Sequence, residues 1–248
     1  MSNVHDGHRE RVREKYIKYG LQGMQEHELL ELILFYSRVR GDTNELSHRL
    51  INVFGSLAGV FEAPIEELLK VEGVGEQTAV LISLVYDTYG AVQLSKTLDI
   101  RYVNTFDDMR RYIAPHYLNR KNEMPSVLYL DAKKKIIGYF ELPEGTFKSA
   151  YMNIKTIVER AVRLNAVYFV LAHNHPSGIA IPSSNDKETT FRIEEVFRGI
   201  GVQLLDHIIF ADNDCVSMAE SGILQLSSEV RRYFGFADYY EEKQVRTV

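Results

Sequence analysis

Two histidines and an aspartate stand at a spacing that suits a metal ion. His173 and His175 are separated by one residue, and Asp186 follows after ten more. The apolar run 167–172 just before them is typical of a strand, so both imidazoles should project from one face where that strand ends. Two imidazole nitrogens and one carboxylate leave a fourth tetrahedral position open, which is the composition of a catalytic zinc site.

The residues between these candidates indicate how the aspartate is positioned. Pro176 and Gly178 stop the strand and turn the chain. The stretch 186–199 carries apolar residues among charges and is predicted to be a helix, with Asp186 in its first turn. Ser183 and Asp186 also have the spacing of a helix capping box, which is a structural explanation for both residues. Capping and catalysis do not exclude each other.

The complete pattern resembles a known one. His-x-His-Pro, followed after six residues by Ser and after two more by Asp, resembles the JAMM (MPN-plus) metalloprotease motif, and the form of residues 173–178 resembles the RadC family. The resemblance implies a cytidine-deaminase-like α/β/α domain that binds one Zn²⁺ per chain through His173, His175 and Asp186. It also implies that Ser183 stabilises the oxyanion during hydrolysis of an amide, peptide or isopeptide bond in a protein or peptide substrate.

Hydrolysis by zinc also needs a general base, for which a glutamate outside the motif is expected. The candidates are Glu123, Glu141, Glu144 and Glu159. Glu159 lies in a helical pattern that predicts a solvated face, and Glu141 and Glu144 lie near a turn after the apolar run 136–140. Spacing does not choose among them. The resemblance assigns the role to Glu123, which opens the first core strand before a Leu-Asp pair.

The chain departs from the RadC pattern in one place. Residues 145–146 keep the family's Gly-Thr, but 152–155 read Met-Asn-Ile-Lys where His-Pro-Arg-Glu is usual. This segment is expected near the substrate groove, so the change bears on substrate preference. Downstream, 204–210 again resembles the family. Asp206 and His207 alternate across a predicted strand, so one of them should face the site, as a support for a metal ligand or within a structural hydrogen-bonded pair.

Composition narrows the class of protein. No stretch approaches the roughly 18 apolar residues of a membrane span, and the N-terminus lacks an apolar signal region, so a cytoplasmic protein without a membrane partner is expected. The single Cys215 excludes an internal disulfide, a cysteine-rich zinc site and the cysteine signature of zinc deaminases. The formal net charge of -5 gives no general attraction to nucleic acid.

Two domains can be drawn from the change in periodicity. Residues 1–95 are predicted to be helical and 106–226 to form the α/β hydrolase domain, joined by a polar linker at 96–105. Residues 227–248 form a charged, tyrosine-rich tail. The clearest helical stretches are 27–35, 44–54, 64–70 and 76–94.

Within the first domain, the sequence Gly73-Val74-Gly75 between two helical stretches resembles a helix-hairpin-helix module. In such a module backbone amides approach a DNA phosphate, which predicts at most a weak DNA contact here, because Glu72 and Glu76 flank the glycines. A tight junction between two helices is the structural alternative. A second functional reading follows, in which the chain is a DNA-associated factor or a nuclease-like hydrolase targeted by this domain.

Overall fold

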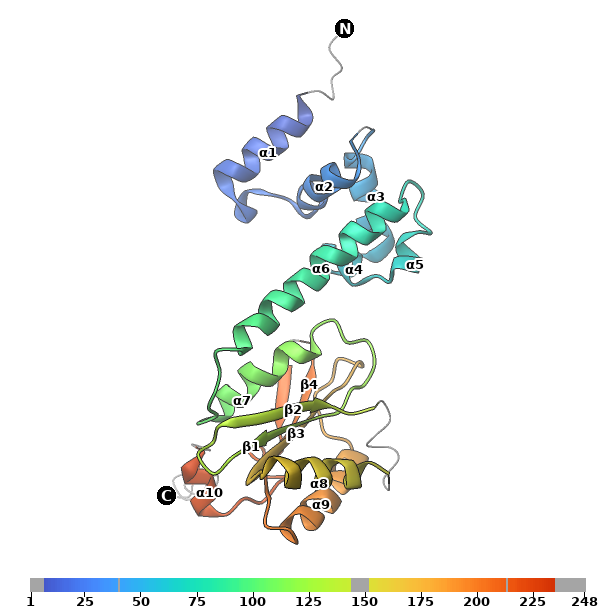
Figure 1. Cartoon of the computed structure of the whole chain (residues 1–248). Coiled ribbons are helices and arrows are strands. Elements are labelled where there is room, and N and C mark those ends of the chain that lie inside the picture. The colour runs from blue at the N-terminus through green and yellow to red at the C-terminus, as the bar shows by residue number, and fades with distance from the viewer. Residues whose placement is uncertain (1–6, 40, 144–151, 213, 235–248) are drawn as a thin grey trace, which may run out of the picture. The chain divides into compact units, whose positions relative to one another are not determined.

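The computed structural model describes residues 7–39, 41–143, 152–212 and 214–234. The chain divides into two compact units, residues 1–92 and 93–248 (Figure 1). This division falls inside helix α6 (Glu76–Thr97), three residues before the boundary at residue 95 that the sequence predicts.

The first unit is helical, as predicted. Its described elements are α1 (His8–Tyr19), the 3-10 helix η1 (Leu21–Gly23), α2 (Glu26–Ser37), α3 (Asn44–Phe54), α4 (Leu57–Glu62), α5 (Ile65–Leu68) and most of α6 (Glu76–Thr97). Their core contains the fully buried side chains Leu30, Leu34, Leu50 and Ile82. On each of these helices the buried residues lie three or four positions apart and so form one apolar side: Leu30 and Leu34 on α2, Leu46 and Leu50 on α3, and Ala79 and Ile82 on α6.

A buried carboxylate also ties three elements of this unit together. Glu31 on α2 is 1% exposed and accepts hydrogen bonds from the side chains of Thr43 and Asn44 at the start of α3. His8 on α1 lies 3.0 Å from the same carboxylate. Because each oxygen has a partner, the cost of burying the carboxylate is offset.

The second unit is built on a five-stranded sheet in the order β2-β1-β3-β4-β5. The strands are β1 (Ser126–Leu130), β2 (Ile136–Glu141), β3 (Tyr168–Asn174), β4 (Gln203–Ala211) and β5 (Asp214–Ser217). Strands β3 and β4 are parallel, and every other pair is antiparallel.

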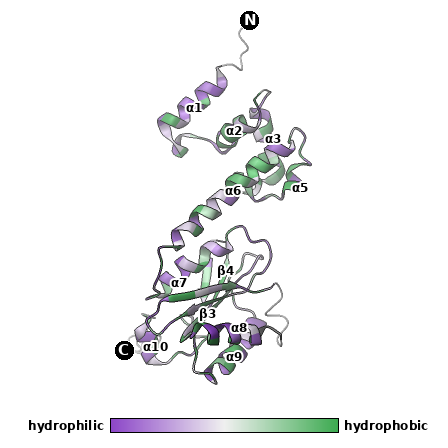
Figure 2. Cartoon of the chain, in the orientation of Figure 1, coloured by the Kyte–Doolittle hydropathy of each residue, from purple (hydrophilic) through white to green (hydrophobic). Residues whose placement is uncertain are grey.

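Helices cover both faces of this sheet. Helix α7 (Phe106–Ile113) and the 3-10 helix η2 (Ala114–Tyr117) lie on one face, and α8 (Met152–Leu164) and α9 (Ser184–Arg198) on the other (Figure 1). Figure 2 shows polar and apolar residues mixed along α8 and α9, as expected of helices with one buried side. The three layers confirm the predicted α/β/α class.

Side-chain alternation assigns the site residues to a face. Phe169 on β3 packs against Phe197 of α9, and His173, four residues further along the same strand, points to the same side. On the opposite face Phe210 of β4 packs against Tyr117. The two histidines of the motif therefore face the α9 layer.

The segment predicted as a linker is partly built into the second unit. Val103 is fully buried and donates its N–H to the carbonyl of Lys134, and Tyr102 forms an isolated bridge with Lys135. At the other end of the chain, α10 (Ser228–Tyr233) docks through the buried Phe234. In the described part of the chain no helix has an apolar stretch long enough to cross a bilayer.

Candidate metal centre

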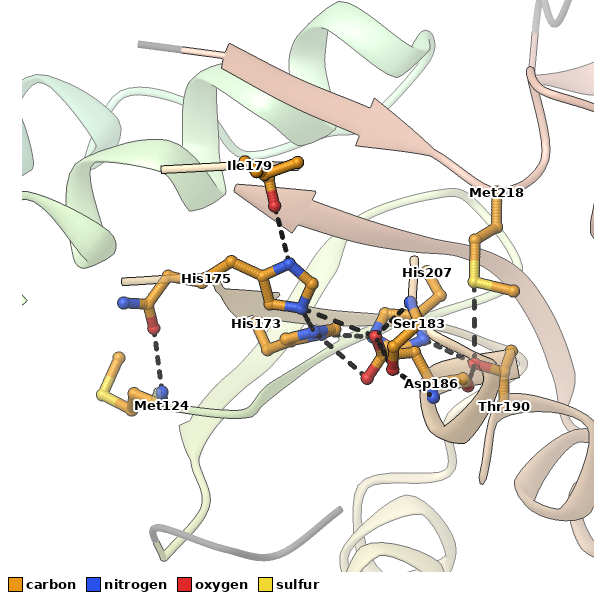
Figure 3. A network of polar contacts seen from close by, with 10 residues as sticks. Met124, His173, His175, Ile179, Ser183, Asp186, Thr190, His207 and Met218 are labelled. Carbon is orange, nitrogen blue, oxygen red and sulfur yellow. Dashed lines mark hydrogen bonds and ion pairs between the residues drawn. The ribbon is translucent and has the colours of Figure 1, made fainter. Parts of the chain in front are cut away.

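The side chains of His173, His175 and Asp186 meet at the end of β3. Nε2 of His173 lies 2.9 Å from Nε2 of His175, 3.4 Å from Oδ1 of Asp186, and Nε2 of His175 lies 3.5 Å from Oδ2 of Asp186 (Figure 3). His173 and Asp186 are buried, at 0% and 3% exposure, and His175 is partly exposed. The end of β3 and the first turn of α9 thus bring together the three residues that the spacing suggested.

The orientation of the His175 ring is set by the loop that follows it. Its Nδ1 lies 2.8 Å from the backbone carbonyl of Ile179. A carbonyl only accepts, so Nδ1 carries the proton and Nε2 keeps a lone pair directed at the cluster.

A chain of hydrogen bonds fixes His173 in the same way. Thr190 on α9 donates its hydroxyl proton to the carbonyl of Asp186, so its oxygen accepts from Nδ1 of His207. Nε2 of His207 is then unprotonated and accepts from Nδ1 of His173 over 2.8 Å. Burial, followed by the nearby His173, lowers the pKa of His207 well below its ordinary value, which keeps this imidazole neutral. Nε2 of His173 is left as an acceptor.

When both imidazoles are neutral, the cluster therefore directs two nitrogen lone pairs and a carboxylate at one another. At separations of 2.9–3.5 Å these acceptor atoms repel one another unless a cation, either a proton on Nε2 or a metal ion, lies among them. Ligand atoms bound tetrahedrally to zinc at about 2.05 Å lie about 3.3 Å apart, which matches these separations. The donor set fits a divalent metal ion.

Hydrogen bonds from Ser183 hold the carboxylate of Asp186 in place and in its ionised form. It is the N-cap residue of α9, and its hydroxyl accepts from the N–H of Asp186 and donates to Oδ2 of the same residue over 2.6 Å. The N–H of Ser183 donates to Oδ2 as well. Burial alone would raise the pKa of Asp186, but His173 and the hydrogen bonds from Ser183 outweigh it and hold that pKa well below its ordinary value.

The segment that carries Glu123 is hydrogen-bonded to Asn174, the residue between His173 and His175. Asn174 accepts from the N–H of Met124 over 2.8 Å and donates to the carbonyl of Asn122 over 3.1 Å. Residues 119–124 line a depression of about 470 Å³. Glu123 is half-buried on this segment and is not one of the three side chains of the cluster.

The other glutamates considered for the base have different surroundings. Glu141 pairs with Arg120 at 2.8 Å, and Glu159 with Lys155 at 3.8 Å, both on the surface. Glu144 lies outside the described residues, as do residues 145–151. The segment 152–155, where the chain departs from the RadC pattern, opens helix α8.

Asp206 serves the fold rather than the metal cluster. It lies on the sheet face opposite His207, accepts from Ser217 Oγ and from the N–H groups of His207 and Ala219, and is completely buried. Burial raises the pKa of Asp206 to about 6. It follows that His207 is the member of this pair that supports the site.

The sequence did not single out Thr190 or Asn174. Thr190 stands four residues after Asp186, so helical periodicity places it on the same side of α9 and offered a signal. Asn174 carried no comparable signal, because its partners lie about 50 residues upstream.

Comparisons with known proteins agree with this architecture. A model described as the RadC-like JAB domain matches residues 103–223, and one described as the UPF0758 N-terminal family matches 6–80. A UPF0758 protein of Clostridium perfringens is 33% identical over 215 residues, covering 87% of this chain and 94% of that protein. One from Bacillus pumilus is 34% identical, covering 89% and 98%, and one from Ruegeria pomeroyi is 32% identical, covering 88% and 97%. The chain belongs to the UPF0758 family and carries a RadC-like JAB domain in its second unit.

Proposed function

We propose that this protein is a zinc-dependent hydrolase of the JAMM type that cleaves an amide, peptide or isopeptide bond. The observation that carries the proposal is the convergence of Nε2 of His173, Nε2 of His175 and the carboxylate of Asp186, with both imidazole tautomers set by hydrogen bonds. A zinc ion held by these side chains would supply Lewis-acid activation of water and of a substrate carbonyl.

The remaining chemistry falls to the protein's own side chains. Glu123 accepts the proton of the attacking water and passes it to the departing amine. The family pattern supports this role, and the hydrogen bond from Met124 to Asn174 holds the segment that carries Glu123 beside the end of β3. The Ser183 hydroxyl lies beside Asp186 at the edge of the cluster, from which it can assist the oxyanion of the substrate. In the present geometry that hydroxyl donates to Asp186, so assisting the oxyanion requires it to rotate.

The experiment that tests the proposal compares two bond types with one protein preparation. Zinc-loaded protein is incubated with a peptide and isopeptide library and, in parallel, with single-stranded and duplex DNA, and a His175→Ala variant serves as the matched control. Cleavage of amide bonds that the variant lacks would support the proposal. Cleavage of phosphodiesters alone would replace it by the nuclease-like alternative, and cleavage of neither would remove the assignment as a hydrolase.

A second candidate function, weak DNA binding by the first unit, is favoured by two arginines at the Gly73-Val74-Gly75 hairpin. Arg38 donates to the carbonyl of Gly73 over 2.9 Å, and Arg49 donates to that of Glu72 over 2.7 Å. Arg49 also lies 3.8 Å from the carboxylate of Glu72, so it offsets one of the two acids that flank the glycines. A Cβ added at Gly75 would meet nothing within 4 Å, so the backbone at the start of α6 is open to a phosphate.

Gly75→Val is the direct test, because Gly73 has a φ of +90° and any side chain there would strain the hairpin. Affinity for duplex DNA is measured by fluorescence anisotropy across a salt series. We expect Gly75→Val and Arg38→Gln each to weaken binding, and the slope of log affinity against log salt to reflect only a few phosphates. Equal binding by all three proteins would assign the hairpin to packing.

A further inference from the structure

The segment between the second histidine and Ser183 presents two branched apolar side chains to solvent. Ile179 is 59% exposed and Ile181 is 69% exposed, whereas Ala180 is buried at 5% and Pro182 is also buried. This alternation is that of an extended chain, so the two isoleucines share one side. Single exposed apolar residues are common on proteins. Here two of them lie on one side of a segment that begins and ends beside the cluster of His173, His175 and Asp186.

This segment is held rigidly at both ends by the cluster itself. The carbonyl of Ile179 accepts from Nδ1 of His175 (Figure 3), and Ser183 bonds to Asp186 through its N–H and its hydroxyl. Between them Ala180 packs into the core of the second unit. The backbone that carries the two isoleucines is therefore tied to His175 at one end and to Asp186 at the other, rather than forming a free loop.

A glycine sets the direction in which the segment leaves the strand. Gly178 has a φ of +79°, and a Cβ at this position would lie 2.9 Å from Oδ2 of Asp212 in the turn after β4. Its N–H donates to the carbonyl of His175. The positive φ favours glycine at this position, and the turn that it allows leads to Ile179, whose carbonyl faces the imidazole of His175.

We infer that Ile179 and Ile181 form an apolar subsite that binds a substrate side chain close to the scissile bond. This inference rests on the proposed function and narrows its substrate class to peptides or protein segments with an aliphatic or aromatic residue beside the cleaved amide. Contact with such a residue removes apolar surface of both partners from water, whereas a polar or charged residue gains nothing there. The hydrolase then selects its substrates by the side chain next to the cleaved amide. The residues His173, His175, Ser183 and Asp186 of the motif do not by themselves specify this preference.

The test measures the affinity of the zinc-loaded protein for inhibitors that bind through the metal, because this affinity does not depend on turnover. Hydroxamate derivatives of short peptides, with leucine, phenylalanine, serine or aspartate next to the hydroxamate, are titrated against zinc-loaded protein. The Ile179→Thr, Ile181→Thr double variant keeps the β-branched shape and loses apolar surface. Acetohydroxamate, which has no side chain, reports on the metal cluster alone. Ile200→Thr is the matched control, since Ile200 is an exposed isoleucine of the same unit at 43%.

We expect the wild-type protein and Ile200→Thr to bind the leucine and phenylalanine compounds roughly tenfold to a hundredfold more tightly than the serine and aspartate compounds. The double variant should lose this preference and bind acetohydroxamate as the wild type does. The same preference in the double variant, or none in the wild type, would overturn the inference. Weakened acetohydroxamate binding by the double variant would also overturn the inference. The isoleucines would then be needed for the structure of the segment between His175 and Ser183, not for contact with a substrate side chain.

Cleavage assays on the same proteins separate this inference from the proposed function. A wild-type protein that shows the side-chain preference in binding but cleaves no peptide would retain the subsite and lose the hydrolase assignment. A protein that cleaves peptides with equal efficiency whatever the neighbouring side chain would retain the hydrolase and lose the subsite.

Discussion

Nδ1 of His173 donates a hydrogen bond to Nε2 of His207 over 2.8 Å, so one buried imidazole holds another in the tautomer that leaves Nε2 of His173 directed at the candidate metal site. The direction of this bond is set further away, by the hydroxyl of Thr190 and the carbonyl of Asp186. A candidate metal ligand on a strand is in this way oriented by the helix that carries another candidate, Asp186.

Removing the hydroxyl at the end of this chain should weaken metal binding without unfolding the protein. Thr190→Val keeps the shape but leaves Nδ1 of His207 without its acceptor, so His207 no longer has a fixed tautomer. We expect zinc affinity to fall about tenfold to a hundredfold, the range typical of residues that support metal-binding histidines. Competition with a chromophoric chelator measures the affinity. Thr190→Ser should restore it; if Val and Ser behave alike, packing rather than the hydroxyl is responsible.

The metal itself should bind at about one equivalent per chain and stabilise the fold. His173→Ala combined with His175→Ala removes two of three ligands, and the domain should remain folded on the core of its sheet and helices. Added zinc should raise the melting temperature of the wild type and not that of the double variant, since only binding to the folded state stabilises it. Metal content by elemental analysis gives the stoichiometry. Retention of zinc near one equivalent by the double variant would contradict the ligand assignment.

Glu123→Gln should separate proton transfer from metal binding. The amide keeps the shape of the side chain but cannot accept the water's proton, so zinc content should be unchanged and turnover should fall by a factor of roughly 10² to 10⁴. Glu141→Gln is the matched control, because Glu141 pairs with Arg120 on the surface and should keep its activity. A loss of turnover in Glu141→Gln and not in Glu123→Gln would assign the role of general base to Glu141 on β2.

Asp206 should give the stability of the second unit a pH dependence of its own. The pKa of Asp206 is raised to about 6 by burial, so the folded state favours its protonated form. Its contribution to stability is fully present below the ordinary pKa of an aspartate and is lost as pH rises through about 6. The span of the shift corresponds to about 3 kcal/mol.

The Asp206→Asn variant lacks this titration and provides the measurement. Urea unfolding of metal-free wild type and variant is compared at about pH 4 and about pH 7.5. The free energy of unfolding of the variant, relative to the wild type, should increase between these two values. Asp214→Asn, at an exposed position on β5, should show no such change. Parallel pH curves for Asp206→Asn and the wild type would show that this carboxyl does not titrate as its burial suggests.

The local sequence determined much of this protein. The helices of the first unit follow from apolar residues at helical spacing, and the strand that ends in two histidines follows from an apolar run stopped by Pro176 and Gly178. Because Ser183 and Asp186 form a capping box, the aspartate had to lie in the first turn of a helix. These features depend on residues close together in the chain, so a linear pattern was enough to predict the elements that carry His173, His175 and Asp186 and that these side chains would meet.

Only the tertiary structure decided which residues support those ligands. Alternation along β4 left Asp206 and His207 as equal candidates. The parallel register that pairs Leu171 with His207 placed the imidazole on the face of His173 and the carboxylate on the other. The tether from Asn174 to Met124 depends likewise on the antiparallel pairing of β3 with β1. Such contacts join residues tens of positions apart, and no local periodicity encodes them, because they exist only once the strands have chosen their neighbours and register.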